Sequence, residues 1–442
     1  MPSNLLNIGA SGAMAARRAL DLTAQNIANA GNPDYARRTL SMAEVASKSG
    51  IGIEPGNVLS GVRPDRVMRS DSMFLQNEAR RTGSDLSRAE AELAGLSNAE
   101  NAVEQAGIYG AVVDFEASLA RLQADPLGSA LRTAVLEDAR ALAQGFSIAT
   151  QGLDAVEQGA QQSADAGVDK VNLLAAELAR TNSGIARARD GSSDMAALYD
   201  RRDALLRDLT DLTGGTTTFD DRGRATLTLG GEVLVTGAQA NTFASSTNPD
   251  GSLAFSVDGN AAALTSGSLL GQSQALQAVG GLRTQLDDLA AEVITLTNTA
   301  QANGAALDGS AGQPFFSGSG AGDIALALTS GAQIATAPAG SPANSRDTSN
   351  LQALRDALAN GGPAQSADAL LFGLSSAIDA RSVTRDALRT IADSAGAALQ
   401  AETGVDLDQE ATNLLRYQQA FQANGKVIQA AADIFDTVLG LG

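Results

Sequence analysis

The chain has 442 residues and a formal net charge of −19, and it contains no cysteine, histidine or tryptophan. Its length predicts about two to four domains, and its acidic charge argues against nucleic acid or an anionic membrane surface as a partner. The absence of cysteine excludes a disulfide framework and a thiolate metal site. The absence of histidine removes the commonest general base and metal ligand.

Residues 3–30 are predicted to form an amphipathic helix in which small residues such as Gly9 and Gly12 allow a partner to approach closely. Gly31 suits a left-handed cap and Pro33 cannot continue the helix, so we expect it to end here. We expect no cleavable signal peptide, because no basic segment precedes an uninterrupted apolar core, and no apolar run is long enough for a membrane span. One helical face comprises Leu5, Ile8, Ala16, Leu20, Thr23 and Ile27.

The next part of the chain is predicted to be an irregular arm followed by a helical bundle. Residues 32–68 are rich in glycine and proline, with a short strand expected at residues 58–62, and a loop of this length tends to be functional or to bridge domains. The helices that follow are rich in alanine and leucine and have short connections, which is typical of a bundle. They are expected at residues 71–106, 110–123, 128–160, 165–188 and 194–213.

From Thr216 the apolar residues alternate, which predicts strands. The pair Gly230-Gly231 is a good two-residue hairpin turn, so residues 216–265 are interpreted as a small antiparallel β-domain inserted into the bundle. The helical period returns near residue 271, and residues 303–346 are rich in small residues and proline, which indicates a long loop with a possible strand at residues 324–328. Two more helices are expected at residues 349–360 and 366–401.

The last stretch, residues 404–442, is predicted to form a capped helix with a heptad seam. Asp406 followed by Gln409 resembles a capping box, and Asp408 and Glu410 add negative charge where the helix dipole favours it. Steps of four and three residues reach ten positions, eight of them apolar, so we expect this helix to pack against the N-terminal one. The ten positions are Leu407, Ala411, Leu414, Gln418, Phe421, Gly425, Ile428, Ala432, Phe435 and Leu439.

The predicted fold is therefore mainly α with a small β insertion. The N- and C-terminal helices pair as a coiled coil, the centre is a bundle of long helices, and the antiparallel β-domain is inserted into it. The corresponding domain boundaries are residues 1–45 with 402–442, residues 46–215 with 266–401, and residues 216–265.

No pattern predicts catalysis, a cofactor or a metal. Asp200, Arg202 and Asp203 form a charged cluster, but such residues on an exposed helix face are usually solvated or salt-bridged. The sequence has no phosphate-binding loop, no H-E-x-x-H and no G-x-S-x-G pattern. We therefore expect that the protein is not an enzyme.

Periodicity alone leaves two functions open. The terminal heptads can close an ordinary bundle, which would give a self-contained secreted helical protein, such as an adhesin or a hydrolase carrying a β-module, with ordered termini. Alternatively, the seam serves neighbouring molecules, and the termini of the isolated protein are exposed. Residues 32–35, Asn-Pro-Asp-Tyr, have on their own the composition of a plain turn.

Several motifs carry a family resemblance that extends over nearly the whole chain. The N-terminal Asn-Ile-Ala-Asn, the following Asn-Pro-Asp-Tyr and the basic residue after it are similar to a signature of flagellar rod, hook and hook-associated proteins. The C-terminal run from Gly404 to Asp436 more specifically resembles the family of the first hook-associated protein. Three internal stretches also match that family, at residues 200–205 (D-x-R-D-x-L), 267–271 and 303–316.

The resemblance implies a structural subunit of the bacterial flagellum, at the junction of hook and filament. Terminal helices of this family form an inner tube wall, the helical middle a second shell and the β insertion the outer surface. The family's subunits leave the cell uncleaved through the flagellar type III export channel, with a dedicated chaperone on the C-terminal region.

The implied partners are further copies of the chain, hook protein and the next junction protein, with no nucleic acid and no membrane insertion. Another axial protein, namely the second junction protein, hook protein or a flagellin-like protein, is the alternative within this class. The expected assembly interface comprises Leu5, Ile8, Leu20, Ile27, Asn29, Pro33, Tyr35, Leu407, Leu414, Phe421, Ile428, Phe435 and Leu439.

Overall fold

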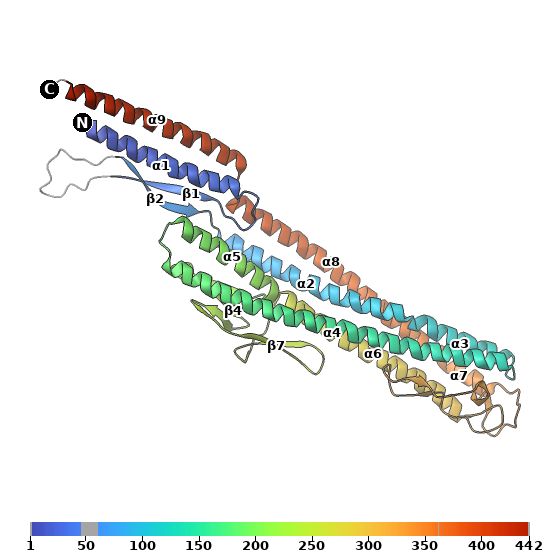
Figure 1. The fold of residues 1–442 in the computed structure, drawn as a ribbon. Helices are drawn as coiled ribbons and strands as arrows, with labels where there is room; N and C mark the ends of the chain where they lie inside the picture. Colours follow the sequence, from blue (N-terminus) through green and yellow to red (C-terminus); the bar gives the residue numbers. More distant parts are fainter. Residues whose placement is uncertain (1, 46–60, 361, 441–442) are drawn as a thin grey trace.

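The computed structural model describes residues 2–45, 61–360 and 362–440. The molecule is elongated, with both termini at one end and long helices running to the other (Figure 1). The predicted fold class, mainly α with a small β insertion, is confirmed, and so is the pairing of the terminal helices. The helices are α1 Pro2–Ala28, α2 Met73–Ala106, α3 Ile108–Ala124, α4 Ser129–Arg187, α5 Ser193–Thr213, α6 Ser268–Ala302, α7 Ser349–Ala359, α8 Pro363–Thr403 and α9 Leu407–Leu439.

The terminal helices α1 and α9 lie side by side at one end of the molecule (Figure 1). The predicted N-cap of α9 is confirmed, because the Asp406 carboxylate accepts hydrogen bonds from the backbone N–H groups of Asp408 and Gln409, but the described residues show no returning bond from the Gln409 side chain that would complete a capping box. The predicted left-handed cap at Gly31 is wrong. Gly31 has no positive φ, and α1 instead unwinds through successive backbone turns, such as that from the Tyr35 N–H to the Asn32 oxygen at 3.1 Å.

A two-stranded hairpin follows α1, where the sequence analysis predicted an irregular arm. Strand β1 Arg38–Glu44 pairs antiparallel with β2 Val62–Arg69, with a bulge after Ser41. The expected strand at residues 58–62 lies almost entirely outside the described residues. The hairpin escapes a periodicity search because its strands are largely polar and β2 contains a proline.

Long helices make the bundle, and α4 continues over 59 residues. The predicted break in it, between residues 160 and 165, is wrong. The segment contains neither glycine nor proline, and its core stripe runs on from Leu153 through Ala164 to Val168. The core at the far end is built around Phe115, whose ring meets those of Phe315 and Phe316 edge-on at 5.6 and 6.1 Å between centroids.

The predicted antiparallel β insertion is present and packs against α4 and α5. Gly230 and Gly231 have φ of 56° and 97°, the left-handed values that a tight hairpin turn requires. A four-stranded sheet has the order β3-β4-β5-β6 and a three-stranded sheet the order β7-β8-β9. The strands are β3 Thr216–Phe219, β4 Ala225–Leu229, β5 Glu232–Thr236, β6 Gln239–Ala240, β7 Phe243–Thr247, β8 Leu253–Val257 and β9 Asn260–Ala261.

The segment predicted as a long loop after α6 is anchored by a fully buried arginine of α4. The Arg132 guanidinium donates to the backbone oxygens of Pro126, Gly331 and Ile334, at 2.7, 3.0 and 2.8 Å, and to Thr336 Oγ1 at 3.0 Å. The short elements of this segment are β10 Gly304–Ala305, β11 Phe316–Ser317, β12 Ala325–Leu326, the 3₁₀ turn η1 Gly331–Gln333 and β13 Ala337–Pro338. The strand expected at residues 324–328 is thus present in shortened form.

Candidate assembly interface

The contact between α1 and α9 is closest at two glycines of α1. A Cβ atom added at Gly9 would lie 2.8 Å from Ile428 Cγ1, and one added at Gly12 would collide with the Asn424 side chain. These two glycines therefore let the helix backbones approach closely. The most buried residues of α9 are Glu410, Asn413 and Ala431.

The heptad seam of α9 does not lie in this contact as a whole. Leu414 and Ile428 are half-buried, but the larger seam residues face away. The expected packing of α9 against α1 is confirmed, but only part of the seam lies in the contact, where Ile428 meets Gly9 and the neighbouring Asn424 meets Gly12. The exposed seam residues are Leu407 at 54%, Phe421 at 44% and Phe435 at 53%.

The apolar face of the N-terminal helix α1 is likewise only partly buried. Leu5 is exposed at 42%, whereas Ile8, Leu20 and Ile27 are half-buried. Other large apolar side chains on the two helices are exposed as well, namely Leu6, Met14, Leu415 and Ile434. The side chain of Leu439, the last expected interface residue, lies outside the described side chains. The helix pair thus exposes many of its large apolar side chains.

The turn after α1 is held by Asn26. Its side-chain oxygen accepts hydrogen bonds from the Tyr35 hydroxyl at 2.7 Å and from the Arg38 backbone N–H at 3.1 Å, and its amide donates to the Arg38 backbone oxygen at 2.8 Å. Tyr35 is buried, and burial raises the pKa of its hydroxyl. Pro33 is exposed and Asn29 half-buried, its amide donating to the Gln25 backbone oxygen. The Asn-Ile-Ala-Asn and Asn-Pro-Asp-Tyr motifs therefore form one structural unit.

This turn is tied to both the C-terminal helix and the bundle. Arg37 Nε lies 2.7 Å from a carboxylate oxygen of the buried Glu410, and the Arg37 backbone N–H donates to the Thr403 oxygen at the end of α8. Asp34 forms an ion pair with Arg207 of α5. The turn after α1, the adjoining ends of α8 and α9, and helix α5 lie far apart in the sequence but meet here. We call this meeting point, at residues 33–38, 403–410 and 200–207, the joint.

A buried network of charges completes the joint. Asp200 Oδ2 accepts from Arg38 Nη2 and its Oδ1 from Arg69 Nε, both at 2.6 Å. Asp203 pairs with Arg69 at 2.8 Å and with Arg202 at 2.6 Å. Burial lowers the pKa of Arg69, but the two carboxylates outweigh burial and raise it. The expectation that Asp200, Arg202 and Asp203 are salt-bridged is confirmed, but the expectation of an exposed face is wrong, because the hairpin and α2 cover this side of α5.

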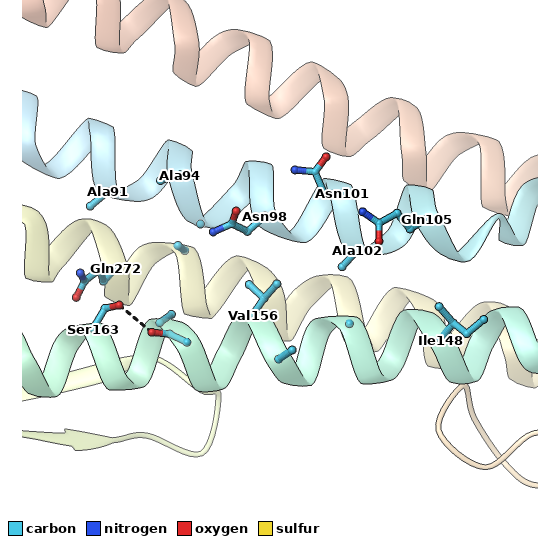
Figure 2. Close-up of a pocket in the computed structure, with 16 residues that line it drawn as sticks. Ala91, Ala94, Asn98, Asn101, Ala102, Gln105, Ile148, Val156, Ser163 and Gln272 are labelled. Carbon is cyan, nitrogen blue, oxygen red and sulfur yellow. Dashed lines mark hydrogen bonds between the residues drawn. The ribbon is translucent and has the colours of Figure 1, made fainter.

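A cavity in the bundle offers no acid–base chemistry. It lies between α2, α4 and α6 (Figure 2), and its volume is about 640 Å³. Its sixteen lining residues are mainly alanine and glycine with side-chain amides such as Asn98 and Gln105, and none of them titrates near neutral pH. Over the described ranges, no group of three acidic, histidine or cysteine side chains is placed to hold a metal ion, and no helix is long and apolar enough to cross a membrane.

Two family models match the chain. The model described as "Flagellar hook-associated protein FlgK helical domain" matches residues 93–316, and that described as "Flagellar basal body rod FlgEFG protein C-terminal" matches residues 400–441. The first lies over the bundle and the β insertion, and the second over α9 and the end of α8.

Curated relatives carry the name flagellar hook-associated protein 1. The Escherichia coli K12 protein is 29% identical over 333 residues, which cover 71% of this chain and 60% of the relative. The Bacillus subtilis 168 protein is 25% identical, over 97% of this chain and 96% of the relative. The chain thus spans about 60% of the length of the Escherichia coli relative. The flagellar hook junction protein FlgK from Burkholderia pseudomallei is a similar solved structure, with 21% identity, a TM-score of 0.49, and coverage of 55% of this chain and 46% of that one.

Proposed function

Because the chain belongs to the family of the flagellar hook-associated protein FlgK, we propose that it is a structural subunit of the bacterial flagellum that joins hook to filament. In this proposal the subunit assembles at the hook tip through its paired terminal helices. The partners are further copies of the chain, hook protein and the next junction protein, and a dedicated export chaperone binds the C-terminal region. The protein works outside the cell, is exported without a cleaved signal peptide, and catalyses no reaction.

The observation that carries this proposal is the exposed apolar surface of α1 and α9. Large apolar side chains in water mark contact sites, and the pair exposes several along its length, including Leu5, Phe421 and Phe435. Within one chain the two helices are in close contact where Gly9 and Gly12 of α1 meet Ile428 and Asn424 of α9. The heptad seam therefore has most of its large residues free for the helices of a neighbouring molecule.

The ion pairs of the joint support the same proposal. The joint fixes the helix pair to the bundle through directional ion pairs, so that one end of the molecule can assemble while the other keeps its own core. We propose the units predicted above, namely residues 1–45 with 402–442, residues 46–215 with 266–401, and residues 216–265. The hairpin β1–β2 packs on α1 and is shared between the first two.

The proposal is tested by placing a charge on the exposed seam. Phe421→Asp and Leu414→Asp should lower assembly about ten-fold or more, because a central apolar residue of an interface typically contributes about 2 kcal/mol or more. Gln422→Asp is the matched control, since it adds the same charge to an exposed polar position of the same helix. Each variant is expressed in a flagellated host that lacks its own copy, and filaments, swimming and the exported protein are measured.

The test requires that the helical bundle of each variant stays folded. We expect the thermal unfolding of the bundle, followed by circular dichroism, to match the wild type in both variants, because Phe421 is exposed in the single chain and the half-buried Leu414 lies on α9, outside the two core clusters of the bundle and the β insertion. Normal filaments with Phe421→Asp would refute an interface at the seam. Unfolding of the central bundle together with the loss of assembly would show instead that the seam belongs to the chain's own core.

A further inference from the structure

A second cavity lies at the joint itself. Its volume is about 110 Å³, and it is lined by the turn after α1, by β2, α2 and α5, and by the end of α8. This volume exceeds the space that a single water needs, yet it is well below the roughly 300–1,000 Å³ of pockets for larger organic ligands. The cavity therefore suits one small group.

The carboxylates around this cavity are already occupied. Asp200 uses one oxygen for Arg38 and the other for Arg69. Asp203 uses one oxygen for Arg69, at 2.8 Å, and the other for Arg202 Nε, at 2.8 Å. Three arginines thus engage all four carboxylate oxygens.

A fourth arginine, Arg80 of α2, also lines the cavity and forms no salt bridge with a carboxylate of residues 2–45, 61–360 or 362–440. It is only 6% exposed, and its one hydrogen bond among the described residues runs from Nη2 to the amide oxygen of Asn77, at 2.6 Å. Among those residues, no carboxylate oxygen lies within 4 Å of its guanidinium nitrogens. Buried charge without a counter-charge is costly, and a guanidinium keeps its proton in proteins.

The surrounding charges are engaged with one another and place no carboxylate directly against Arg80. Four arginines, at positions 38, 69, 80 and 202, face two buried aspartates. Asp71, which is partly exposed, lies 3.6 Å from Arg69 and offsets one more charge. At the rim, Asp34 is paired with Arg207, and the nearby Glu410 is paired with Arg37. Arg207 also pairs with Asp208, at 3.1 Å, so these charges balance in sum, but among the described residues none of the carboxylates lies within 4 Å of the Arg80 guanidinium.

A neighbouring side chain contributes an unused acceptor. Gln76 is 5% exposed and also lines the cavity, and its Nε2 donates to Asp71 and to Asp203. These bonds fix the orientation of the amide, and its Oε1 has no hydrogen-bond donor in the part of the chain that the structure describes. A ligand that offers negative oxygens together with one O–H group would satisfy both Arg80 and Gln76.

We propose that this cavity is a binding site for one small protonated oxyanion of the hydrogen-phosphate type. The Arg80 guanidinium donates to its charged oxygens, and Gln76 Oε1 accepts from its hydroxyl group. Residues of the terminal segment and of the bundle line the same cavity, so the bound anion also bridges the two parts of the joint. Sulfate has the same shape without the proton at neutral pH, and it binds more weakly because it leaves Oε1 unpaired.

The test is titration of the 442-residue chain with inorganic phosphate at constant ionic strength, followed by calorimetry and by ³¹P line broadening. We expect saturable binding of one phosphate per chain. The Arg80→Gln variant should bind about ten-fold or more weakly, since one charge-assisted contact is lost. Arg81→Gln is the matched control, because Arg81 lies next in sequence but is exposed and paired with Glu78, and it should bind like the wild type.

A second variant covers the case in which Arg80→Gln does not fold. Ala79→Glu places a carboxylate in the cavity, where it can pair with Arg80, and it should fold but bind no phosphate. Absence of phosphate binding to the wild type, or unchanged binding to the folded Arg80 variant or to Ala79→Glu, would overturn the site and leave water as the partner of Arg80. Sulfate binding as tight as phosphate binding would overturn the role of Gln76.

Discussion

Replacement of Asp200 by asparagine tests whether the buried charges hold the joint together. The Asp200 side chain is 11% exposed and accepts hydrogen bonds from Arg38 and Arg69, both at 2.6 Å. Asparagine has nearly the same shape, but its NH₂ group would face one of the two guanidinium donors, so that hydrogen bond is lost. The remaining hydrogen bond has a neutral amide oxygen as its acceptor in place of a charged carboxylate oxygen. Removal of one partner from a buried ion pair costs about 3–5 kcal/mol, and we expect a loss of that size in the free energy of opening of the joint.

Hydrogen exchange read by mass spectrometry measures this free energy locally. The relevant peptides cover residues 26–44 and 62–70, because Asn26 holds the backbone of Arg38 and the hairpin carries Arg69. A loss of about 3 kcal/mol corresponds to exchange that is about 100-fold faster or more. Asp208→Asn is the control. Asp208 lies on the same helix and binds Arg207, but both are more than 40% exposed, so the change should stay below about 1 kcal/mol.

The reasoning would be refuted by equal exchange in the two variants. If the Asp200→Asn joint exchanges within about five-fold of the wild type, the buried arginines gain their stability from other groups, and the network does not hold the turn.

Burial raises the pKa of Asp211 from 3.8 to about 6, so the folded state binds this proton more tightly than the unfolded state, and the contribution of Asp211 to stability falls as the pH rises from about 4 to 6. At pH 7 Asp211→Asn should therefore raise the free energy of unfolding by up to about 3 kcal/mol and shift the urea midpoint upward. Below pH 4 the variant should match the wild type. Equal urea midpoints at pH 7 would contradict this. Gly12→Val should separate α1 from α9, because an added Cβ collides with Asn424, and should speed exchange in both helices, whereas Gly31→Val meets open space and should not. Limited proteolysis with mass spectrometry should remove roughly the first and last forty residues before it cuts the bundle, and equal resistance of the termini would indicate a self-contained fold.

Local features of the fold could be predicted from the sequence. The cap at Asp406 and the Gly230-Gly231 turn each depend on a few adjacent residues, and their chemistry determines the geometry. The bundle helices carry their own apolar stripes, so their positions also follow from the chain alone. It is harder to predict whether two helical segments form one continuous helix, as α4 shows. A short polar segment between two apolar stripes does not indicate whether the helix ends there or continues.

The joint could not be predicted, because its residues have no common period. Arg38 and Arg69 meet Asp200 only because the hairpin pairs positions 38 and 69 and places both beside α5. The orientation of α9 is a similar case. The sequence shows an apolar stripe, but the phase in which α9 meets α1 depends on the glycines of the partner helix. The motif at residues 200–205 was found by resemblance, and its structural role became visible only in three dimensions.

The ion pairs of the joint and the exposed apolar residues of the terminal helices have different roles, as expected for a subunit that assembles at one end. Apolar side chains tolerate sliding along a helix, whereas ion pairs at 2.6 Å between buried groups fix both distance and direction. The molecule places the directional contacts at the joint, where the angle between the terminal pair and the bundle is set. It leaves large apolar residues such as Phe421 on the outside of the pair, where many copies can pack in register. In the proposed assembly an error in that angle would be repeated by every subunit, so the joint has to be more rigid than the interface that it orients.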